Sequence, residues 1–542
     1  ATPGYTRLSP QLDPLQGMPI TGELQPGAGV ALSAIHRNID ESLESRIRLA
    51  IGDETAATAR GGALVRMESF FDDLNRIGVG TRLDEFFAAF DELLNAPEDI
   101  AIRDLTVSAG VALSDSIRNL RSQLTGLGDD VDGQIGSLAD SADALARQIA
   151  QLNREITEVE AGRPAQATGL RDQRDGLLRQ LSEIFDVTVR EQADGTINIY
   201  IGGETLVQGS IVRGLIASEE LDGEQARTSI RFADTNQQVQ VRAGTLAGLL
   251  SVRDQDSRIA MLDRLAEAII FEVNRIHADG QGSSGFTSVI GAADVFDPDA
   301  ALDSAAAGLA QTPDNGTFYI TVVDDATQTP VAHRIDVVLD GTSQGATLAS
   351  LAADISAQVD GVTASVTNDN RLRLDADAGV SFMFGFDGQD ARPDTSGVLA
   401  ALGINTFFSG SDARSITVNE TLKAQPSLLA SASVFLPGDG TIAGRIAQLG
   451  SVSSGKLDAA SIPEFYRLMA NGAAIATAAA LDDVDATSSI LISLQTQRES
   501  ISGVNLDEEA IQLIKFQRAF QGTARFIGVV DDLLAELITL VR

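Results

Sequence analysis

A heptad repeat of apolar residues runs through the last 38 residues of the chain, 505–542. Such a repeat predicts an α-helix with one continuous apolar face. At 1.5 Å per residue the helix would be roughly 55 Å long, and no short neighbouring segment could cover a face of that length. We therefore expect a coiled-coil seam that requires a partner helix, formed by Leu506, Leu513, Phe516, Phe520, Ile527, Val530, Leu534, Leu537 and Val541.

A second heptad repeat lies at 131–159. Its apolar residues alternate spacings of four and three, which is the a/d pattern of a packed helix, before Gly162 and Pro164 end it. We expect all nine positions to face a core: Val131, Ile135, Leu138, Ala142, Leu145, Ile149, Leu152, Ile156 and Val159. Helices of this length predict a rod of antiparallel helices.

Composition excludes several classes of protein. The 542 residues exceed what a single core normally supports, so several domains are expected. Lys and Arg together number 40 against 76 Asp and Glu, a net charge of -36, which argues against a nucleic-acid partner. The chain has no cysteine, hence no disulfide or thiolate chemistry. It also has no apolar run of 18 or more residues, so we expect no membrane insertion.

Two sequence signatures resemble a known family. Residues 498–509 (RESISGVNLDEE) and 514–520 (IKFQRAF) are similar to the C-terminal signature of flagellar hook-associated protein 1, the hook-filament junction family. Residues 1–7 (ATPGYTR) resemble the segment that follows an N-terminal helix in flagellar axial proteins. The resemblance implies that this helix, the natural partner of 505–542, is missing from the chain. Residues 170–178, 274–280, 397–405 and 407–410 also resemble the family.

We predict an α+β multidomain chain: an elongated rod of bundled, heptad-type helices that carries β-rich inserted outer domains. The expected parts are an extended connector at 1–27, the ascending half of the inner helical rod at 28–186, a β-hairpin subdomain at 187–245, a rod helix at 246–284, an outer α+β domain at 285–418, the descending half of the rod at 419–504 and the C-terminal coiled-coil helix of the core at 505–542.

Local patterns supply the elements of these parts. The spacing of Ile35, Ile39, Leu43 and Ile47 predicts helix from Gly29 onwards. Alternating apolar residues around a turn at 194–195 predict a hairpin over 187–201, and 230–232 with 239–241 predict a second one. Residues 246–277 return to a helical pattern. In the outer domain we expect strands at 318–322, 331–339, 362–366 and 372–374 and a helix at 348–359.

The sequence contains no pattern specific to catalysis. The three histidines, His36, His277 and His333, are far apart, and we expect structural or solvated roles for His36 on a helix and His333 in a strand. Asp297, Asp299 and Asp303 lack the order of a calcium loop, so a solvated loop is favoured. Residues 438–444 lack the lysine of a phosphate loop and predict a helix-entry turn.

Three phenylalanines are considered as a possible cofactor site. Phe86, Phe87 and Phe90 have helical spacing and predict core rather than a cofactor site. We therefore expect no enzyme activity, no catalytic residue, no cofactor and no metal.

The resemblance implies a structural subunit of the bacterial flagellum that joins hook to filament by self-assembly through terminal helices. Its implied partners are copies of itself in a tubular assembly, hook protein, the second junction protein and an export chaperone at the C-terminal helix. The implied location is extracellular, at the hook-filament junction, after export by the flagellar type III system. The alternatives are another axial protein, either the second junction protein or hook protein, and a surface adhesin or enzyme that uses the outer domain.

Overall fold

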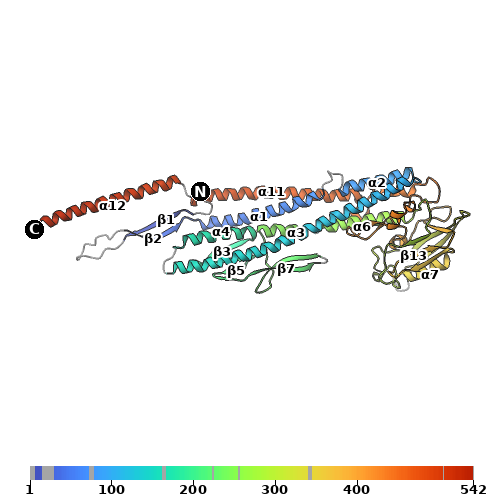
Figure 1. Ribbon diagram of the computed structural model, residues 1–542, viewed down its shortest axis with the longest axis horizontal. Helices are drawn as coiled ribbons and strands as arrows, with labels where there is room; N and C mark the ends of the chain where they lie inside the picture. Colours follow the sequence, from blue (N-terminus) through green and yellow to red (C-terminus); the bar gives the residue numbers. More distant parts are fainter. Residues whose placement is uncertain are drawn as a thin grey trace. The chain divides into compact units, whose positions relative to one another are not determined.

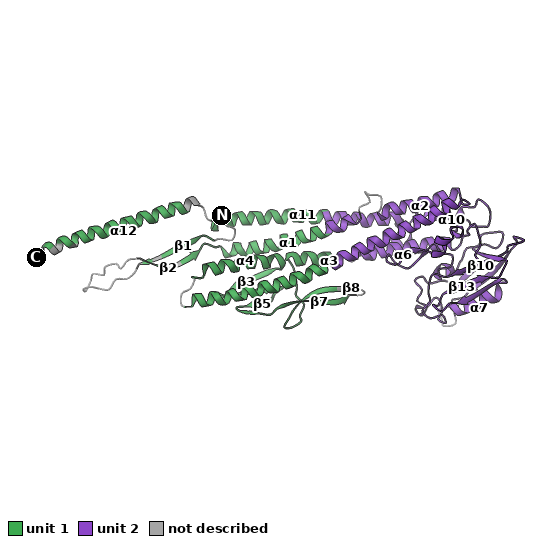
Figure 2. Ribbon diagram, in the orientation of Figure 1, with its two compact units in different colours: residues 1–63, 130–254, 478–542 green, residues 64–129, 255–477 purple. Residues whose placement is uncertain are grey.

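The computed structural model describes residues 6–14, 30–71, 78–161, 166–222, 225–253, 257–339, 345–503 and 506–540. Its chain forms two compact units (Figure 2). Unit 1 comprises residues 1–63, 130–254 and 478–542, and unit 2 comprises 64–129 and 255–477. Three long helices contribute a part to each unit: α1 (Glu41–Ser69), α3 (Ile100–Glu160) and α11 (Ile462–Ser502).

Helices form the core of unit 1. The side chains of Leu43, Ile47 and Ile51 on α1 pack against Leu494 on α11. The start of α1 is capped, because the backbone N–H of Leu43 donates to Asp40 Oδ1 at 3.1 Å. The remaining helices of this unit are α4 (Thr168–Ile184), α5 (Gly244–Arg253) and α12 (Leu506–Leu540).

The predicted connector contains a strand that we did not expect. β1 (Leu8–Pro14) pairs antiparallel with β2 (Val30–Arg37), and α1 begins only at Glu41, so the prediction of helix from Gly29 is wrong. Residues four apart, such as Ile35 and Ile39, lie on the same face of a helix and also on the same face of a strand. This spacing therefore cannot distinguish a helix from a strand. His36, expected on a helix, is on β2.

A four-stranded antiparallel sheet follows α4 in unit 1, in the order β3-β4-β5-β6. The predicted hairpin over 187–201 is confirmed, and its turn glycine, Gly195, has a φ of +80°. The strands are β3 (Val187–Glu191), β4 (Ile197–Ile201), β5 (Glu204–Gln208) and β6 (Ile211–Val212).

The second predicted hairpin has the wrong partner. β8 (Gln225–Phe232) pairs along its whole length with β7 (Leu215–Asp222), whereas 239–241 form no strand. Only an isolated bridge joins Arg231 to Gln238. Alternation identified the strand but could not select its neighbour, and the adjacent strand offers a longer backbone ladder.

α3 is much longer than the helix predicted at 131–159, and its buried face is displaced. Val131, Ile135, Ala142, Ile149 and Ile156 are buried as expected. Leu138, Leu145 and Leu152 are only half-buried and Val159 is 51% exposed, so the prediction that all nine face the core is wrong. The buried positions beside them are the next residues along the chain, which heptad counting of large apolar side chains passes over: Ala139, Ala146, Asn153 and Glu160.

Unit 2 has an aromatic core where α2 (Val79–Asn95) meets Phe407 and Phe408. The rings of Phe86 and Phe90 lie 5.1 Å apart, and each lies 5.5 Å from the ring of Phe407. The expectation that Phe86, Phe87 and Phe90 are core residues is confirmed. The single helix expected at 246–277 is two helices, α5 in unit 1 and α6 (Ser257–His277) in unit 2, with 254–256 outside the described residues.

The β-rich part of unit 2, which carries the labels β13 and α7 in Figure 1, contains two three-stranded antiparallel sheets ordered β11-β10-β14 and β12-β13-β9. The outer-domain strands and helix expected from the sequence are confirmed. The elements are β9 (Ser288–Ile290), β10 (Gly316–Asp324), β11 (Pro330–Val337), α7 (Leu348–Gln358), β12 (Val362–Val366), β13 (Leu372–Ala376) and β14 (Val380–Phe384).

Short elements return the chain to α11. They are α8 (Val398–Ala401), β15 (Phe408–Ser409), β16 (Thr417–Val418), α9 (Glu420–Ala424) and α10 (Thr441–Gln448), with single 3-10 turns at Pro426–Leu428 and Gly455–Leu457. A further 3-10 turn, Ala305–Ala307, lies between β9 and β10. The helix-entry turn expected at 438–444 is confirmed, since α10 begins at Thr441.

Candidate assembly surface

α12 carries the predicted seam, and the side chains of this helix are almost entirely exposed. Leu513, Phe516, Phe520, Ile527 and Val530 are 37–76% exposed. Leu506, Leu534 and Leu537 belong to α12, but their side chains lie outside the described residues, as does all of Val541. The predicted helix is therefore present, and no described helix or strand covers the described side chains of the seam.

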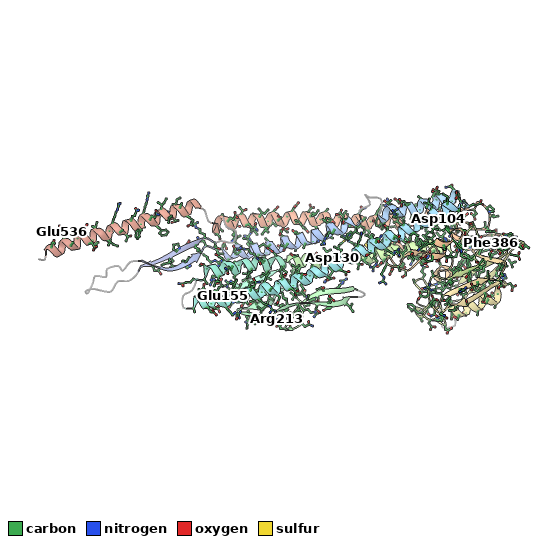
Figure 3. All side chains as sticks on the ribbon, in the orientation of Figure 1. Asp104, Asp130, Glu155, Arg213, Phe386 and Glu536 are labelled. Atoms are coloured by element: carbon green, nitrogen blue, oxygen red, sulfur yellow. The ribbon has the colours of Figure 1, made fainter. Side chains whose placement is uncertain are left out.

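The apolar surface of α12 extends beyond the predicted seam. Further large apolar side chains on it are 49–69% exposed: Ile511, Ile514, Phe526, Val529 and Leu533. Counting by sevens overlooked them because they lie on other faces of the helix. The sequence could have indicated these residues through the total apolar content of 506–540, which exceeds what a single seam requires. Figure 3 labels Glu536, one of the charged side chains that project from this helix.

The end of α11 is fixed within unit 1 by hydrogen bonds of Ser502. The carbonyl oxygen of Ser502 accepts from the backbone N–H of Arg7 at 3.1 Å, and its hydroxyl donates to the carbonyl oxygen of Asn38 at 2.7 Å. The backbone N–H of Asn38 in turn donates to the carbonyl oxygen of Arg7 at 2.9 Å. These bonds tie the end of α11 to the segments that flank the β1-β2 ribbon.

Arg498, one turn earlier, strengthens this joint. Its Nε donates to Glu44 Oε1 at 2.6 Å, and the two side chains are 19% and 12% exposed. Gly503 has no room for a side chain, because a Cβ there would lie 2.2 Å from the carbonyl oxygen of Glu499. Arg498, Ser502 and Gly503 thus fix the end of α11. The heptad periodicity does not identify these residues, whereas the family-like motif at 498–509 includes them.

The 170–178 segment lies on α4 and forms a buried polar network. Arg171 donates to both carboxylate oxygens of Glu160, at 3.0 and 2.8 Å. Arg174 donates to Asn153 Oδ1 at 3.0 Å. Asn153 completes its bonding by donating to the carbonyl oxygen of Ile197 at 3.0 Å, so the network joins α3, α4 and β4. The segment has a structural role in unit 1.

A second network explains the 274–280 and 397–405 segments of unit 2. His277 is fully buried, its Nδ1 donates to the carbonyl oxygen of Asn405 at 2.8 Å and its Nε2 accepts from the N–H of Ala430 at 3.0 Å. Burial lowers the pKa of His277 to about 4, so the ring is neutral. Asn405, in the left-handed region with φ of +52°, donates to the carbonyl oxygen of Gly280 at 2.8 Å.

The other sequence-level candidates for chemistry have local roles. His36 is exposed beside Gln11, and His333 is half-buried on β11. Asp297 accepts from the backbone N–H of Asp299 at 3.0 Å, as in a loop that caps itself. Across the described residues, no group of three or more His, Asp and Glu side chains is placed to hold a metal ion. Among the described helices, none combines the length and hydropathy that crossing a membrane requires.

Family models match two stretches of the chain. Residues 64–291 match the helical domain of flagellar hook-associated protein FlgK, and 495–540 match the C-terminal region of the flagellar basal body rod FlgEFG proteins. Flagellar hook-associated protein 1 of Escherichia coli K12 is 26% identical over 95% of this chain and 90% of its own length. The chain is thus similar to the hook-associated protein 1 family over nearly its whole length.

More distant members of the hook-associated protein 1 family extend this agreement. The Bacillus subtilis protein of the same name is 23% identical over 99% of this chain and 92% of its own length. The structure of the flagellar hook junction protein FlgK from Burkholderia pseudomallei has a similar fold, with a TM-score of 0.51 and 15% identity over 84% of this chain and all of that one. The second family-model match, 495–540, contains the joint at 498–503 and all of α12.

Proposed function

We propose that this chain is a structural subunit of the bacterial flagellum that joins the hook to the filament by self-assembly. The observation that carries the proposal is α12, a helix from 506 to 540 whose described apolar side chains are exposed. An isolated helix of this kind gains little from its own propensity and is stabilised mainly by packing. Its position after the joint at Ser502 supports a role as an element presented to partners.

The driving force for assembly is the burial of these side chains. Each Leu, Ile or Phe that passes from water into a packed interface contributes about 1.5–3 kcal/mol before the costs of association are subtracted. Ten large apolar side chains of α12 are exposed among the described residues, so a partner helix on the seam would cover only some of them. We therefore assign α12 to the core of a multi-subunit assembly, with further copies of the chain as its neighbours.

The remaining partners follow from the same proposal. We assign hook protein and the second junction protein as the neighbours above and below, and an export chaperone as the occupant of α12 before assembly. The protein acts outside the cell, after export by the flagellar type III system. In this scheme 28–186, 246–284 and 419–504 form the inner rod and 285–418 the outer domain. We assign no catalytic role to the chain.

The experiment that tests the proposal removes the gene from its host and examines the flagella by electron microscopy. We expect hooks without attached filaments, unpolymerised filament protein in the medium, and recovery when the gene is returned. Filaments of normal length on the deletion strain would overturn the proposal. Loss of hooks themselves would instead favour a role as hook protein.

A further inference from the structure

A cavity of about 330 Å³ lies in unit 1, lined by the end of β2, the first turns of α1, the helix α4 and the β3-β4 hairpin. This volume is at the lower end of the range for small-molecule sites. Four arginines line the cavity, although the chain as a whole has a net charge of -36: Arg37, Arg48, Arg171 and Arg174. Its acidic lining residues are Glu41, Glu44, Asp175 and Glu191.

Two of the four arginines are fully engaged with carboxylates. Arg37 lies 3.0 Å from Asp172 and also pairs with Asp175. Arg171 lies 2.8 Å from Glu160 and 2.5 Å from Glu191. These pairs neutralise both guanidinium groups and leave no charge for a further ligand.

The carboxylate nearest the start of α1 is also occupied. Glu44 accepts from Arg498 at 2.6 Å and from Arg179 at 3.3 Å, so two arginines outside the cavity lining share it. Asp175 is held by Arg37. Glu41 is an exposed acidic residue of the lining, as is Glu191, which pairs with Arg171.

The other two arginines have no carboxylate at hydrogen-bonding distance among the described residues. Arg48 forms no hydrogen bond or salt bridge there, and its buried Nε has no partner. Arg174 is 2% exposed, and its Nη1 donates to neutral acceptors, Asn153 Oδ1 at 3.0 Å and the carbonyl oxygen of Gly195 at 2.8 Å. The Nε of Arg174 also has no partner among these residues. Burial lowers the pKa of both guanidinium groups.

We propose that this cavity binds a small oxyanion, such as inorganic phosphate or sulfate, between Arg48 and Arg174. A guanidinium group presents a planar fork of donors that matches the oxygens of such an anion, and hydrogen bonds between ionised groups are the stronger kind. The anion would satisfy the free donors that the fold leaves at the cavity wall. The carboxylate of Glu44 is neutralised by Arg179 and Arg498. Glu41 and Asp175 oppose binding, because Arg37 shares its single charge between Asp172 and Asp175.

The test is equilibrium dialysis of the full chain against radiolabelled phosphate, at constant ionic strength set with sodium chloride. We expect saturable binding of roughly one phosphate per chain, and competition by sulfate. Arg48→Ala should weaken binding by about tenfold or more, because it removes one charge-assisted partner. Arg46→Ala is the matched control: it removes the same charge from the exposed side of the same helix and should leave binding unchanged.

Two further variants separate binding from folding. Glu41→Gln should bind phosphate more tightly than the wild type, which a purely structural arginine cluster would not produce. Arg48→Lys keeps the charge without the fork and should fall between Arg48→Ala and the wild type. Absence of saturable binding by the wild type, or equal loss with Arg46→Ala and Arg48→Ala, would overturn the proposal and leave a water-filled cavity.

Discussion

At the scale of single residues, the neutral ring of His277 makes a prediction about acid stability. Its pKa in the folded chain is about 4, below the value of about 6.5 in an unfolded chain, so the unfolded state binds more protons between these values. The contribution of His277 to the free energy of unfolding is therefore fully present above about pH 6.5 and is lost as the pH falls towards 4.

The comparison with His277→Gln isolates this effect, because the buried Asp279, whose pKa is raised to about 6 by desolvation, acts in the opposite direction and is present in both proteins. We expect the variant to unfold more easily than the wild type at pH 7, and the difference between the two to shrink between pH 6.5 and 4. Urea titrations at several pH values measure it. A constant difference across this range would mean that His277 is not buried in its neutral form.

Asn153 makes a second prediction at this scale. Asn153→Ala removes the side chain that donates to the carbonyl oxygens of Ile197 and Gly209 and that accepts from the backbone N–H of Ile197 inside unit 1. We expect the free energy of unfolding to fall by about 2–4 kcal/mol, as for other buried groups that lose their partners. Gln151→Ala, at an exposed position on the same helix, is the control. Equal melting curves for the two variants would contradict the assignment.

Individual residues could be predicted where one property decides their position. The phenylalanines of α2 are large, apolar and helically spaced, and all three are core. Leu145 and Asn153 show the limit: a heptad count places Leu145 in the core and passes over Asn153, yet Asn153 is fully buried and Leu145 is not. Asn153 is inside because Ile197 and Arg174 satisfy it, and that requirement depends on contacts far along the chain.

At the scale of elements, α12 should be the least stable helix of the free chain. Its described apolar side chains face solvent, and no described element covers them, so local opening costs little. We expect fast hydrogen exchange for 506–540 and slow exchange for 131–156 of α3 in the same sample. Protection of α12 equal to that of α3, in a sample shown to be monomeric, would contradict its exposure.

The β-rich part of unit 2 gives the second prediction at the scale of elements. Residues 405–408 return the chain to the helices of unit 2, since Asn405 bonds to Gly280 and Phe407 packs on Phe86. A deletion of 286–402 joined by a short Gly/Ser linker should therefore keep a cooperative helical melt. A deletion of 286–415 removes these contacts and should melt at a lower temperature. If both deletions melt alike, the returning segment does not belong to the helical core.

Elements were predictable where length or turn chemistry removed ambiguity, as in α12 and the hairpin around Gly195. The helix expected from Gly29 failed because a four-residue spacing serves a strand and a helix equally, and β2 owes its conformation to its partner β1. The predicted partner of β8 was wrong for a related reason. Strand pairing depends on two segments, whereas the alternation of apolar and polar residues describes only one.

At the scale of the whole molecule, the seam on α12 is the part of the candidate site that could be predicted from the sequence. That its described side chains are exposed is known only from the structure. The joint at Arg498 and Ser502 needed tertiary contacts with Glu44 and Asn38, which no period contains. The net charge of -36 keeps free copies apart, so assembly depends on apolar contacts strong enough to overcome this repulsion.

The most direct measurement of the central claim is filament attachment in cells that express Phe520→Asp, beside the melting curve of the purified variant. Phe520 is 76% exposed in the free chain, so the added charge faces water there, whereas in an assembly it would be buried at a cost of several kcal/mol. Gln521→Asp adds the same charge one residue away, off the predicted seam, and is the control. The account predicts an unchanged melting temperature, with filaments lost for Phe520→Asp and retained for Gln521→Asp. Normal filaments on cells that express Phe520→Asp would contradict it.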